Sequence, residues 1–576
     1  MPEMIESDVL IVGGGGAAAR AALEAHLQGS KVVMVMKGKF GECGATAYKV
    51  AEMAGYNVAD GKVDPQDNPR EHFKDICRAA AGMCDEGLAK ILTEKALLTI
   101  PELEGWGVNF EKNGDGYLEV TGCFASRPRM HVIKGHSEPI LAALKREIER
   151  RNIQILEFII ISDLLIQDGV CLGALGINER REFFVIKAKS TILATGGAGQ
   201  LFLNNLNPPD ITGDGYALGY RAGAEMVNME FIQAGLGIIY PIRNILNSWV
   251  WLLHPRVYNK EGKEFLQAYL PKVMTLEECM QARSNHYPFS TYDGSQYIDI
   301  AVQKEILSGR GSEHGGVFLD FTKVDEGTLP KTARGDQIRK MWNLTWEWIR
   351  TQRGVDLKKQ PVEVACFGHA INGGLKINER TESTLKGLYA VGEAAGGPHG
   401  ADRLGGNMIL TCQVFGRRAG QFAAEDARVR AISPMPQGVI ERRMERVERM
   451  AKKKGSSKPS ELKKRLQEVM WRDVLVIRSK SSLQDCLQRV EEFSRGMDLG
   501  VAVEKNEELW QAIELQNMLQ VAEMIARAAL LREESRGSHY REDFPKRDDE
   551  NWDRSIITRS EDSGMKQWAE RLPRLG

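Results

Sequence analysis

The sequence feature that most constrains the fold is a run of glycines near the start of the chain. Residues 8–12 read DVLIV, four glycines follow at 13–16, and a helix-favouring segment comes next, so that Gly13, Gly15 and Ala18 have GxGxxA spacing. A strand, a glycine turn and a helix in this order let backbone N–H groups approach a pyrophosphate at the helix N-terminus. The sequence therefore predicts a dinucleotide-binding domain here.

The second predicted strand, at residues 30–37, ends without the acidic residue that usually binds ribose hydroxyls in this motif. Met36 and Lys37 stand at that position. This departure gives no support to a nicotinamide cofactor.

Three further glycine-rich elements lie downstream. Residues 194–199 read ATGGAG, residues 212–215 read TGDG, and residues 389–395 read YAVGEAA. So many elements far from the first turn are unusual for a nucleotide fold that has one glycine loop. A strand that delivers Gly392 and Glu393 to a pyrophosphate or ribitol fits an FAD site, because the carboxylate can accept hydrogen bonds from hydroxyls.

These elements lie on both sides of a middle stretch that has polar loops and many aromatic residues. We therefore expect a discontinuous FAD-binding domain at 1–235 and 351–430, interrupted by a capping or substrate domain at 236–350. Within 431–576 apolar residues recur at three- and four-residue spacing, which indicates helices. The predicted fold is α/β: a Rossmann-like FAD-binding domain, an inserted α+β capping domain and a C-terminal helical domain.

The charge balance and the spacing of the cysteines argue against several classes of function. The chain has 77 Lys and Arg against 78 Asp and Glu, which argues against a nucleic-acid partner. Its nine cysteines include no Cys-x-x-Cys pair, so we expect free thiols in a reducing cytoplasm and no metal or iron–sulfur cluster in this chain. The start does not resemble a signal peptide, and no apolar run reaches the roughly 18 residues of a membrane span. Membrane attachment is expected only through a partner.

Two longer strings carry a family resemblance. Residues 399–407 read HGADRLGGN and residues 534–543 read ESRGSHYRED. They are similar to HGANRLGGN and ESRGAHxRxD of the flavoprotein subunits of fumarate reductase and succinate dehydrogenase, whose relatives include L-aspartate oxidase and adenylylsulfate reductase. The resemblance runs nearly end to end, and it implies FAD as cofactor, a mobile capping domain and an iron–sulfur electron-transfer partner.

The cofactor-binding residues are predicted from the glycine elements and the resemblance together. They are Gly13, Gly15, Gly16, Ala17, Ala18, Lys37, Thr46, Ala194, Thr195, Gly196, Gly197, Asp214, Gly392, Glu393, Asn407, Met408 and Ile409. Succinate dehydrogenases link FAD covalently to a histidine in a segment similar to residues 44–55. No histidine occurs there in this chain, so we expect noncovalent FAD.

The resemblance also implies two substrate-binding residues. Reduction of an alkene flanked by carboxylates needs hydride from the flavin, a proton from an acid, and cationic groups that hold the carboxylates. Arg403 matches the substrate-clamping arginine of the HGANRLGGN string, and His369 lies in a segment that looks like the HYxxGG segment of the family. Arginine suits this role because its planar fork donates two parallel hydrogen bonds.

The chain departs from the family pattern in two places. Where dicarboxylate reductases carry HPTG, residues 234–237 read AGLG. Where they carry RGEGG, whose arginine the resemblance implies as proton donor, Trp251 stands instead. His254 and Arg256 are the nearby residues that could supply the missing cation and acid; the alternative is that both are structural and that the substrate is not a small dicarboxylate.

Three hypotheses remain open at this point. The leading one is the flavoprotein subunit of a complex resembling fumarate reductase or succinate dehydrogenase, acting on fumarate, succinate or a related unsaturated acid. The second is a sulfur-compound reductase resembling the adenylylsulfate reductase alpha subunit, which the two departures favour. The third is a flavin subunit that only relays electrons within a larger complex. The sequence leaves the substrate, the direction and the partner open.

Overall fold

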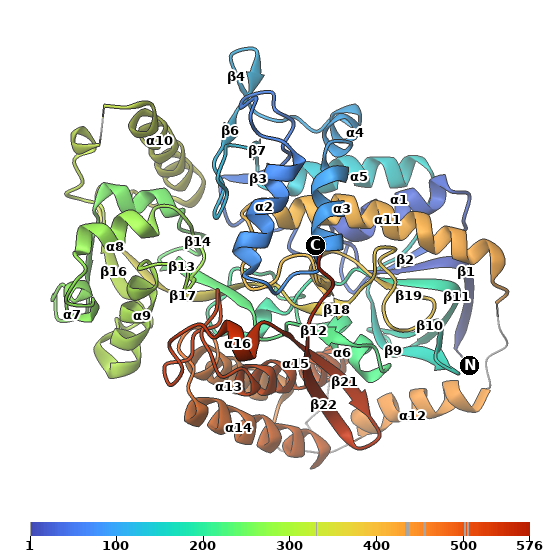
Figure 1. Ribbon diagram of the computed structural model, residues 1–576. Coiled ribbons are helices and arrows are strands. Elements are labelled where there is room, and N and C mark those ends of the chain that lie inside the picture. Colours follow the sequence, from blue (N-terminus) through green and yellow to red (C-terminus); the bar gives the residue numbers. More distant parts are fainter. Residues whose placement is uncertain are drawn as a thin grey trace.

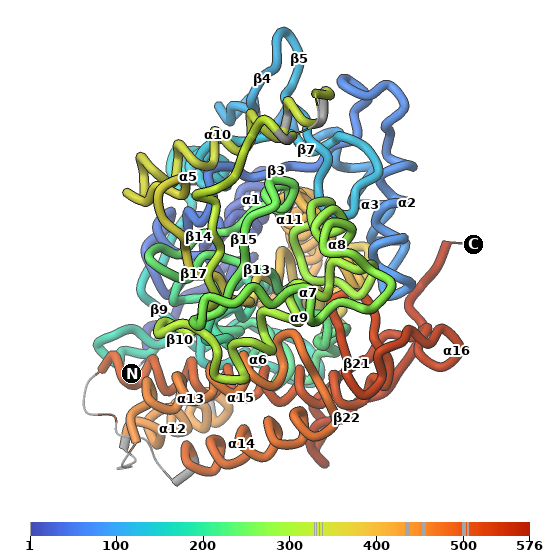
Figure 2. Tube along the Cα trace, turned by 90° about the vertical axis from the view of Figure 1, so that its left-hand side faces the viewer, coloured from blue at the N-terminus to red at the C-terminus, as the bar shows by residue number. Residues whose placement is uncertain are grey.

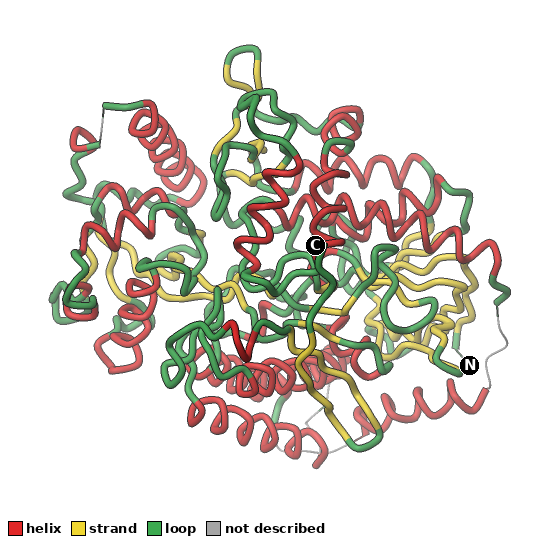
Figure 3. The backbone as a smooth tube through the Cα atoms, viewed as in Figure 1, coloured by secondary structure: helices red, strands yellow, loops and turns green. Residues whose placement is uncertain are grey.

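The computed structural model of the chain describes residues 2–329, 331–432, 437–452, 457–499, 503 and 506–575. Figure 1 shows the largest sheet at the right, a second sheet at the left and a group of helices at the bottom. Figure 3 shows helices beside the strands of these two sheets, and strands that form separate hairpins at the top and at the bottom of the view.

The largest sheet has seven strands in the order β8-β2-β1-β11-β10-β9, with β19 also paired to β11. Strands β2 and β11 run parallel to β1, whereas β10 runs antiparallel to both β9 and β11. Residues Val9–Val12 of β1 are all buried, as expected for a parallel strand that is covered on both faces. The strands are β1 (Glu3–Val12), β2 (Val32–Val35), β8 (Gln154–Leu156), β9 (Ile159–Gln167), β10 (Val170–Asn178), β11 (Phe183–Leu193) and β19 (Leu388–Ala390).

Helices α1 and α11 lie side by side against this sheet (Figure 1). Helix α1 begins directly after the glycine turn, and α11 begins directly after residues 399–406. The helices of this part of the chain are α1 (Gly16–Leu27), α2 (Pro69–Ala80), α3 (Glu86–Ala96), α4 (Thr99–Gly105), α5 (Glu138–Arg150), α6 (Asp214–Arg221) and α11 (Asn407–Val429). The predicted pairing of a strand, a glycine turn and a helix is therefore present.

Two small sheets lie beside these helices. The first has the order β3-β7-β6 and consists of β3 (Met53–Asn57), β7 (Met130–Lys134) and β6 (Glu119–Val120). The second is the hairpin of β4 (Lys112–Asn113) and β5 (Gly116–Tyr117).

A five-stranded sheet with the order β14-β13-β17-β16-β15 forms the middle part of the chain, at the left of Figure 1. Strand β13 begins before the expected capping segment, 236–350, and β17 lies wholly after it; the domain boundaries remain a prediction. The elements are β13 (Ile232–Tyr240), β14 (Asn244–Ile245), β15 (Arg256–Tyr258), β16 (Val317–Asp320), β17 (Val362–Ile371), α7 (Leu266–Tyr269), α8 (Leu276–Arg283), α9 (Gln296–Glu305) and α10 (Ala333–Arg353).

The C-terminal region consists of helices and one hairpin. Helices α12 (Gln437–Lys452), α13 (Pro459–Asp473), α14 (Lys480–Leu499) and α15 (Asn506–Leu531) lie together along one side of the molecule, which both Figure 1 and Figure 2 show. Helix α16 (Asp549–Trp552) follows, and then the strands β21 (Ser555–Glu561) and β22 (Gly564–Glu570). The sequence patterns predicted the helices but not this hairpin.

The C-terminal hairpin completes a sheet whose other strands come from earlier in the chain. The order is β20-β18-β12-β21-β22, with β12 (Met226–Val227), β18 (Gly374–Lys376) and β20 (Ala395–Gly396). Among the described residues, no helix combines the length and the apolar character that crossing a bilayer requires. The α/β fold with a C-terminal helical region is thus the one that the sequence predicted.

Candidate functional site

The glycine turn after β1 brings two strands into very close contact. At Gly13, φ is +129°, and a Cβ atom would lie 2.2 Å from the carbonyl oxygen of Ala194, which directly follows β11. Glycine is therefore required at this position by both conformation and space. Gly15 is the N-cap residue of α1 and contributes no side-chain cap, the N–H of Gly16 donates to Thr46 Oγ1 at 3.1 Å, and this first turn lines a cavity.

This first cavity has a volume of about 130 Å³ and collects most of the predicted cofactor-binding residues. Those that line it are Gly13, Gly15, Gly16, Ala17, Lys37, Thr46, Ala194, Thr195, Gly196, Asp214, Gly392, Glu393 and Met408. Ile409 lines the second cavity instead. Residues from four distant segments therefore meet at one place, as an extended dinucleotide requires.

Three predicted residues, Ala18, Gly197 and Asn407, line neither cavity. Asn407 is fully buried, and its Oδ1 atom accepts from Asn57 Nδ2 at 2.7 Å. A Cβ atom at Gly197 would lie 2.1 Å from Glu393 Oε1, so glycine leaves room for that carboxyl group. Asn407 and Gly197 thus support the site from behind the cavity wall.

The ammonium group of Lys37 replaces the acidic residue that the motif usually carries, and it holds two carboxylates. Its Nζ atom donates to Asp214 Oδ2 at 2.8 Å and to Glu514 Oε1 at 2.6 Å. Burial opposes the charged form of Lys37, but these two carboxylates outweigh it and hold the pKa of Lys37 above its usual range. A carboxylate from α6 is thereby delivered to the edge of the first cavity.

A second cavity of about 830 Å³ adjoins the first. The residues that line both are Gly16, Ala45, Thr46, Glu393, Met408 and Cys412. The Oε1 atom of Glu393 accepts a hydrogen bond from the N–H of Ile371 at 2.9 Å. Burial raises the pKa of Glu393 to about 7, although this N–H and the charge of Arg403 lower it in part. Glu393 thus marks the junction of the two cavities.

Arg403 is a buried cation on the wall of the second cavity. Its side chain is 6% exposed, its Nε atom has no hydrogen-bond partner, and Nη1 donates only to the carbonyl of Leu404 at 3.2 Å. Among the residues that the structure describes, no carboxylate forms a salt bridge with it. Burial lowers the pKa of Arg403, but a guanidinium group stays protonated in proteins. The arrangement therefore leaves a charged fork free for an anion in the cavity.

Two histidines share this wall with Arg403. Burial lowers the pKa of His369 to about 3, and Arg403 and His136 contribute to this shift. Burial also lowers the pKa of His136 to about 4. Both imidazoles are therefore neutral near pH 7 and can donate or accept hydrogen bonds. Sequence reasoning missed His136, which lies in the turn between β7 and α5 and belongs to no motif that we recognised.

The structure does not bring His254 and Arg256 to the cavity. His254 is exposed in a left-handed turn, and the guanidinium of Arg256 pairs with Glu264 at 2.8 Å on the surface. Trp251 is 1% exposed and also lies outside the cavity lining, where Trp249 and Leu252 stand instead. The expectation that His254 or Arg256 replaces the missing arginine finds no support here, because neither residue lines the cavity and the Arg256 guanidinium is paired with Glu264.

The two cavities suit FAD. The glycine turn and the N-terminus of α1 would hold the pyrophosphate, the Lys37–Asp214 pair lies where the ribose hydroxyls would bind, and Glu393 can accept from ribitol hydroxyls. The larger cavity offers the space that a flavin ring and a small substrate need, beside Arg403 and His369. The chemistry of the donors and their order along the cavities thus fits this cofactor.

Comparison with protein families gives two matches. Residues 8–409 match the family described as FAD binding domain, and residues 463–571 match the family described as fumarate reductase flavoprotein C-term. Together they span most of the chain, and they confirm FAD as the cofactor of its family.

Curated relatives agree over the whole length. A fumarate reductase (CoM/CoB) subunit of Methanothermobacter marburgensis is 36% identical over 96% of this chain and 97% of its own length. The succinate dehydrogenase flavoprotein subunit of Rickettsia conorii is 27% identical over 97% of this chain and 93% of its own length.

Among solved structures, Mycobacterium smegmatis Sdh1 in complex with UQ1 matches with a TM-score of 0.84 and 29% identity, covering 100% of this chain and 95% of that one. The adenylylsulfate reductase of Archaeoglobus fulgidus matches with a TM-score of 0.77 and 22% identity, over 100% of this chain and 96% of that one, which shows a shared fold alone.

Proposed function

This chain belongs to the family of fumarate reductase and succinate dehydrogenase flavoprotein subunits, and we propose that its larger cavity binds a small unsaturated dicarboxylate, fumarate or a close relative, beside FAD. Its membership makes it an FAD-dependent oxidoreductase. The observation that carries the proposed substrate class is the buried guanidinium of Arg403, which has no salt bridge to a carboxylate in the described part of the chain.

The energetics favour an anionic substrate at Arg403. A buried charge is costly unless it is paired, and the hydrogen bonds of charged groups contribute about 1.5–3 kcal/mol each. A carboxylate that accepts two parallel hydrogen bonds from the fork would recover this cost on binding. A neutral substrate would leave the cation unpaired, so the cavity selects against it.

The chemistry divides between the cofactor and the chain. FAD supplies hydride transfer when it is bound. Arg403 binds one carboxylate of the substrate and opposes the negative charge that develops there, and the neutral ring of His369 can donate a hydrogen bond to the other carboxylate. The wall of the cavity includes apolar residues such as Leu206 and Ile338, which exclude water around these contacts. We further propose that FAD is bound noncovalently.

We also propose that electrons reach FAD from an iron–sulfur subunit, that the complex works in the cytoplasm, and that any membrane contact is made by partners. The similar Methanothermobacter and Rickettsia proteins are both named as subunits, which supports an assembly. Isolation of the native protein under anaerobic conditions tests this: an iron–sulfur protein should copurify in a fixed ratio. Recovery of the chain alone with full fumarate reductase activity from a physiological donor would contradict the proposal.

Single-turnover reoxidation of the flavin tests the substrate. The purified holoprotein is reduced anaerobically with dithionite and mixed with fumarate, with adenylylsulfate or with buffer, and the return of oxidised-flavin absorbance is followed. Fumarate should reoxidise the flavin rapidly. Arg403→Gln should lower kcat/KM for fumarate by about 150-fold, because two charge-assisted hydrogen bonds of about 1.5 kcal/mol each are lost. His369→Gln should also slow the reaction.

The matched control is Arg256→Gln, which removes a surface arginine outside the cavity and should change kcat/KM by less than about twofold. Reoxidation by adenylylsulfate and not by fumarate would replace the dicarboxylate with a sulfur compound as substrate. Reoxidation by neither acceptor, with electron transfer to the native partner unchanged in Arg403→Gln, would establish a relay subunit instead.

A further inference from the structure

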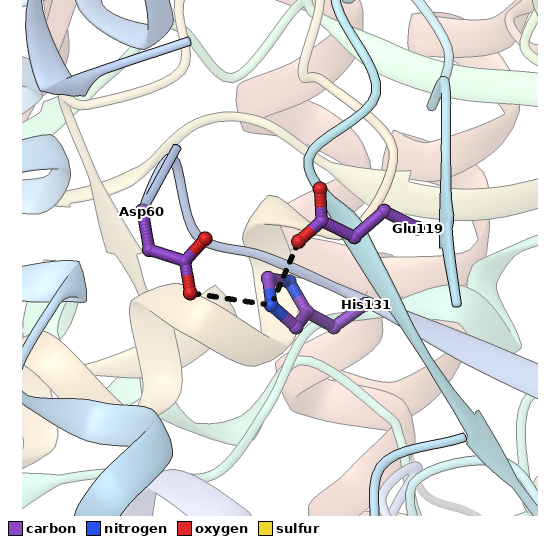
Figure 4. Close-up of side chains that lie close together, drawn as sticks. All are labelled: Asp60, Glu119 and His131. Atoms are coloured by element: carbon purple, nitrogen blue, oxygen red, sulfur yellow. Dashed lines mark ion pairs between the residues drawn. The ribbon is translucent and has the colours of Figure 1, made fainter. Parts of the chain in front are cut away.

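Three ligating side chains converge beside the small sheet β3-β7-β6, outside the cavities described above. They are Asp60, Glu119 and His131 (Figure 4). Strand pairing places Glu119 directly opposite His131, and directly opposed residues in a sheet point their side chains to the same face. Asp60 follows strand β3, the other neighbour of β7, and its carboxylate turns toward the same imidazole nitrogen.

A hydrogen bond to the backbone fixes the tautomer of His131. Its Nδ1 atom lies 3.2 Å from the carbonyl oxygen of Arg129. A carbonyl oxygen can only accept, so Nδ1 carries the hydrogen, and in the neutral ring Nε2 presents its lone pair. This is the arrangement that metal-ligating histidines usually have, in which the second ring nitrogen donates to a backbone carbonyl or a carboxylate.

The lone pair of Nε2 faces two carboxylates. Nε2 lies 3.2 Å from Glu119 Oε1 and 3.7 Å from Asp60 Oδ2. Neither Nε2 nor Glu119 Oε1 has a hydrogen-bond partner, although the side chains of His131 and Glu119 are 0% and 3% exposed. Three electron-rich atoms that face one another in the interior repel unless a cation or a shared proton lies among them.

We propose that Asp60, Glu119 and His131 bind a divalent transition-metal ion, with Zn²⁺ as the ion that the ligand set and spacing fit best. Zinc takes one imidazole nitrogen at about 2.0–2.1 Å and carboxylate oxygens at about 2.0–2.2 Å, which places tetrahedral ligand atoms roughly 3.4 Å apart. The three candidate atoms all lie within 4.8 Å of one another, so small side-chain movements close the site. Solvent completes the coordination.

The surroundings hold the ligands in place. The rings of Tyr117 and Phe110 pack against the imidazole of His131, with centroids 4.8 and 6.0 Å away. The backbone N–H of Lys62 donates to Asp60 Oδ1 at 3.0 Å, which leaves Oδ2 to face the imidazole. The Lys62 ammonium lies 3.3 Å from Asp60 Oδ2 and 4.8 Å from the centre of the Tyr117 ring, and because its side chain is 56% exposed it can turn into solvent when a metal ion binds.

The three ligating side chains lie next to the wall of the larger cavity. The residues next to two of the ligands, Val120 and Met130, line the larger cavity. A bound metal ion would therefore fix β6 and β7 as a wall of that cavity, a structural role separate from hydride transfer.

Metal binding to the FAD-loaded protein tests the site directly. The protein is treated with a chelator, desalted and dialysed against micromolar Zn²⁺, and bound zinc is measured by mass spectrometry. We expect about one tightly bound Zn²⁺ per chain, and an affinity at least about 100-fold weaker in Glu119→Gln and in Asp60→Asn. Both substitutions keep the shape of the side chain, and retained flavin absorbance shows that each variant is folded.

Co²⁺ and a control variant distinguish this site from the cysteines. Bound Co²⁺ should give visible d–d bands without a thiolate charge-transfer band, and these bands should be lost in Glu119→Gln. His314→Gln removes a histidine that pairs with Glu363 at 2.8 Å outside the cluster, and it should bind zinc as the wild type does. The proposal would be overturned if no stoichiometric zinc bound, or if Glu119→Gln and Asp60→Asn both bound zinc as the wild type does. The contact of His131 with the two carboxylates would then be explained by a shared proton.

Discussion

The substitution Glu393→Gln should remove a pH dependence of stability that the structure assigns to a single carboxyl group. Burial raises the pKa of Glu393 from its ordinary value of 4.5 to about 7. Below pH 4.5 the group is protonated in the folded and unfolded chains, and its contribution is at its most favourable. As the pH rises from 4.5 to 7, the unfolded chain releases the proton while the folded chain keeps it, so stability falls with rising pH.

The magnitude follows from the size of the shift. A difference of about 2.5 pKa units corresponds to about 3 kcal/mol of unfolding free energy, lost between pH 4.5 and 7. For a chain of 576 residues the entropy of unfolding is on the order of 1.2 kcal/mol/K, so this loss lowers Tm by about 2–3 °C. Glutamine stays neutral at every pH, so the Glu393→Gln variant does not lose this unfolding free energy as the pH rises.

The assay is the Tm of the flavin-free protein at pH 5 and pH 8, compared between the wild type and Glu393→Gln. The Tm of the variant relative to the wild type should rise by about 2–3 °C between the two pH values. Glu313→Gln, at a side chain that is 85% exposed, serves as the control for the loss of one carboxylate and should show no such rise. A Tm difference for Glu393→Gln that is the same at both pH values would refute the reasoning.

Two further substitutions test the cofactor end of the site. Gly13→Ala places a Cβ atom 2.2 Å from the carbonyl oxygen of Ala194, so the turn must distort. The ratio of flavin to protein absorbance should then show that the purified variant contains little flavin. A full flavin content would contradict this geometry. Lys37→Met leaves Asp214 and Glu514 in the interior without their cation. The loss should lower the unfolding free energy by about 3 kcal/mol and the Tm, measured by calorimetry, by about 2–3 °C. An unchanged Tm would show that the two ion pairs of Lys37 contribute nothing to stability.

The parts of the fold and site that depend on a few neighbouring residues could be predicted from sequence patterns. The turn at residues 13–16 and the element around Glu393 could be recognised from sequence because each needs glycine where two backbone segments lie very close together. This requirement leaves a pattern of only a few residues. The family strings located Arg403 and His369, and the structure places both on one cavity wall. The prediction of FAD as cofactor, which the family match confirms, therefore required only motif spacing and the order of the motifs along the chain.

Contacts between distant segments could not be predicted in this way. Lys37 meets Asp214 across 177 positions, and no single-chain pattern pairs them. His136 lines the cavity from the turn between β7 and α5, which no motif marks, whereas His254 and Arg256 lie near the expected position in sequence but outside the cavity in space. Proximity along the chain was the wrong guide for these two residues.

The hairpin of β21 and β22 has a consequence for how the protein is made. Strand β21 pairs with β12, and β12 also pairs with β18, so the last strands of the chain occupy a sheet that begins with residues 226–227. Ribosomes add roughly 5–20 residues per second, so β12 waits for its partner for on the order of tens of seconds after it is synthesised. Until then one edge of this sheet is exposed and could pair with another chain. We therefore expect chaperones that bind nascent chains to raise the yield of folded flavoprotein. A tag fused directly after β22 should lower the yield if it hinders the pairing of β21 with β12.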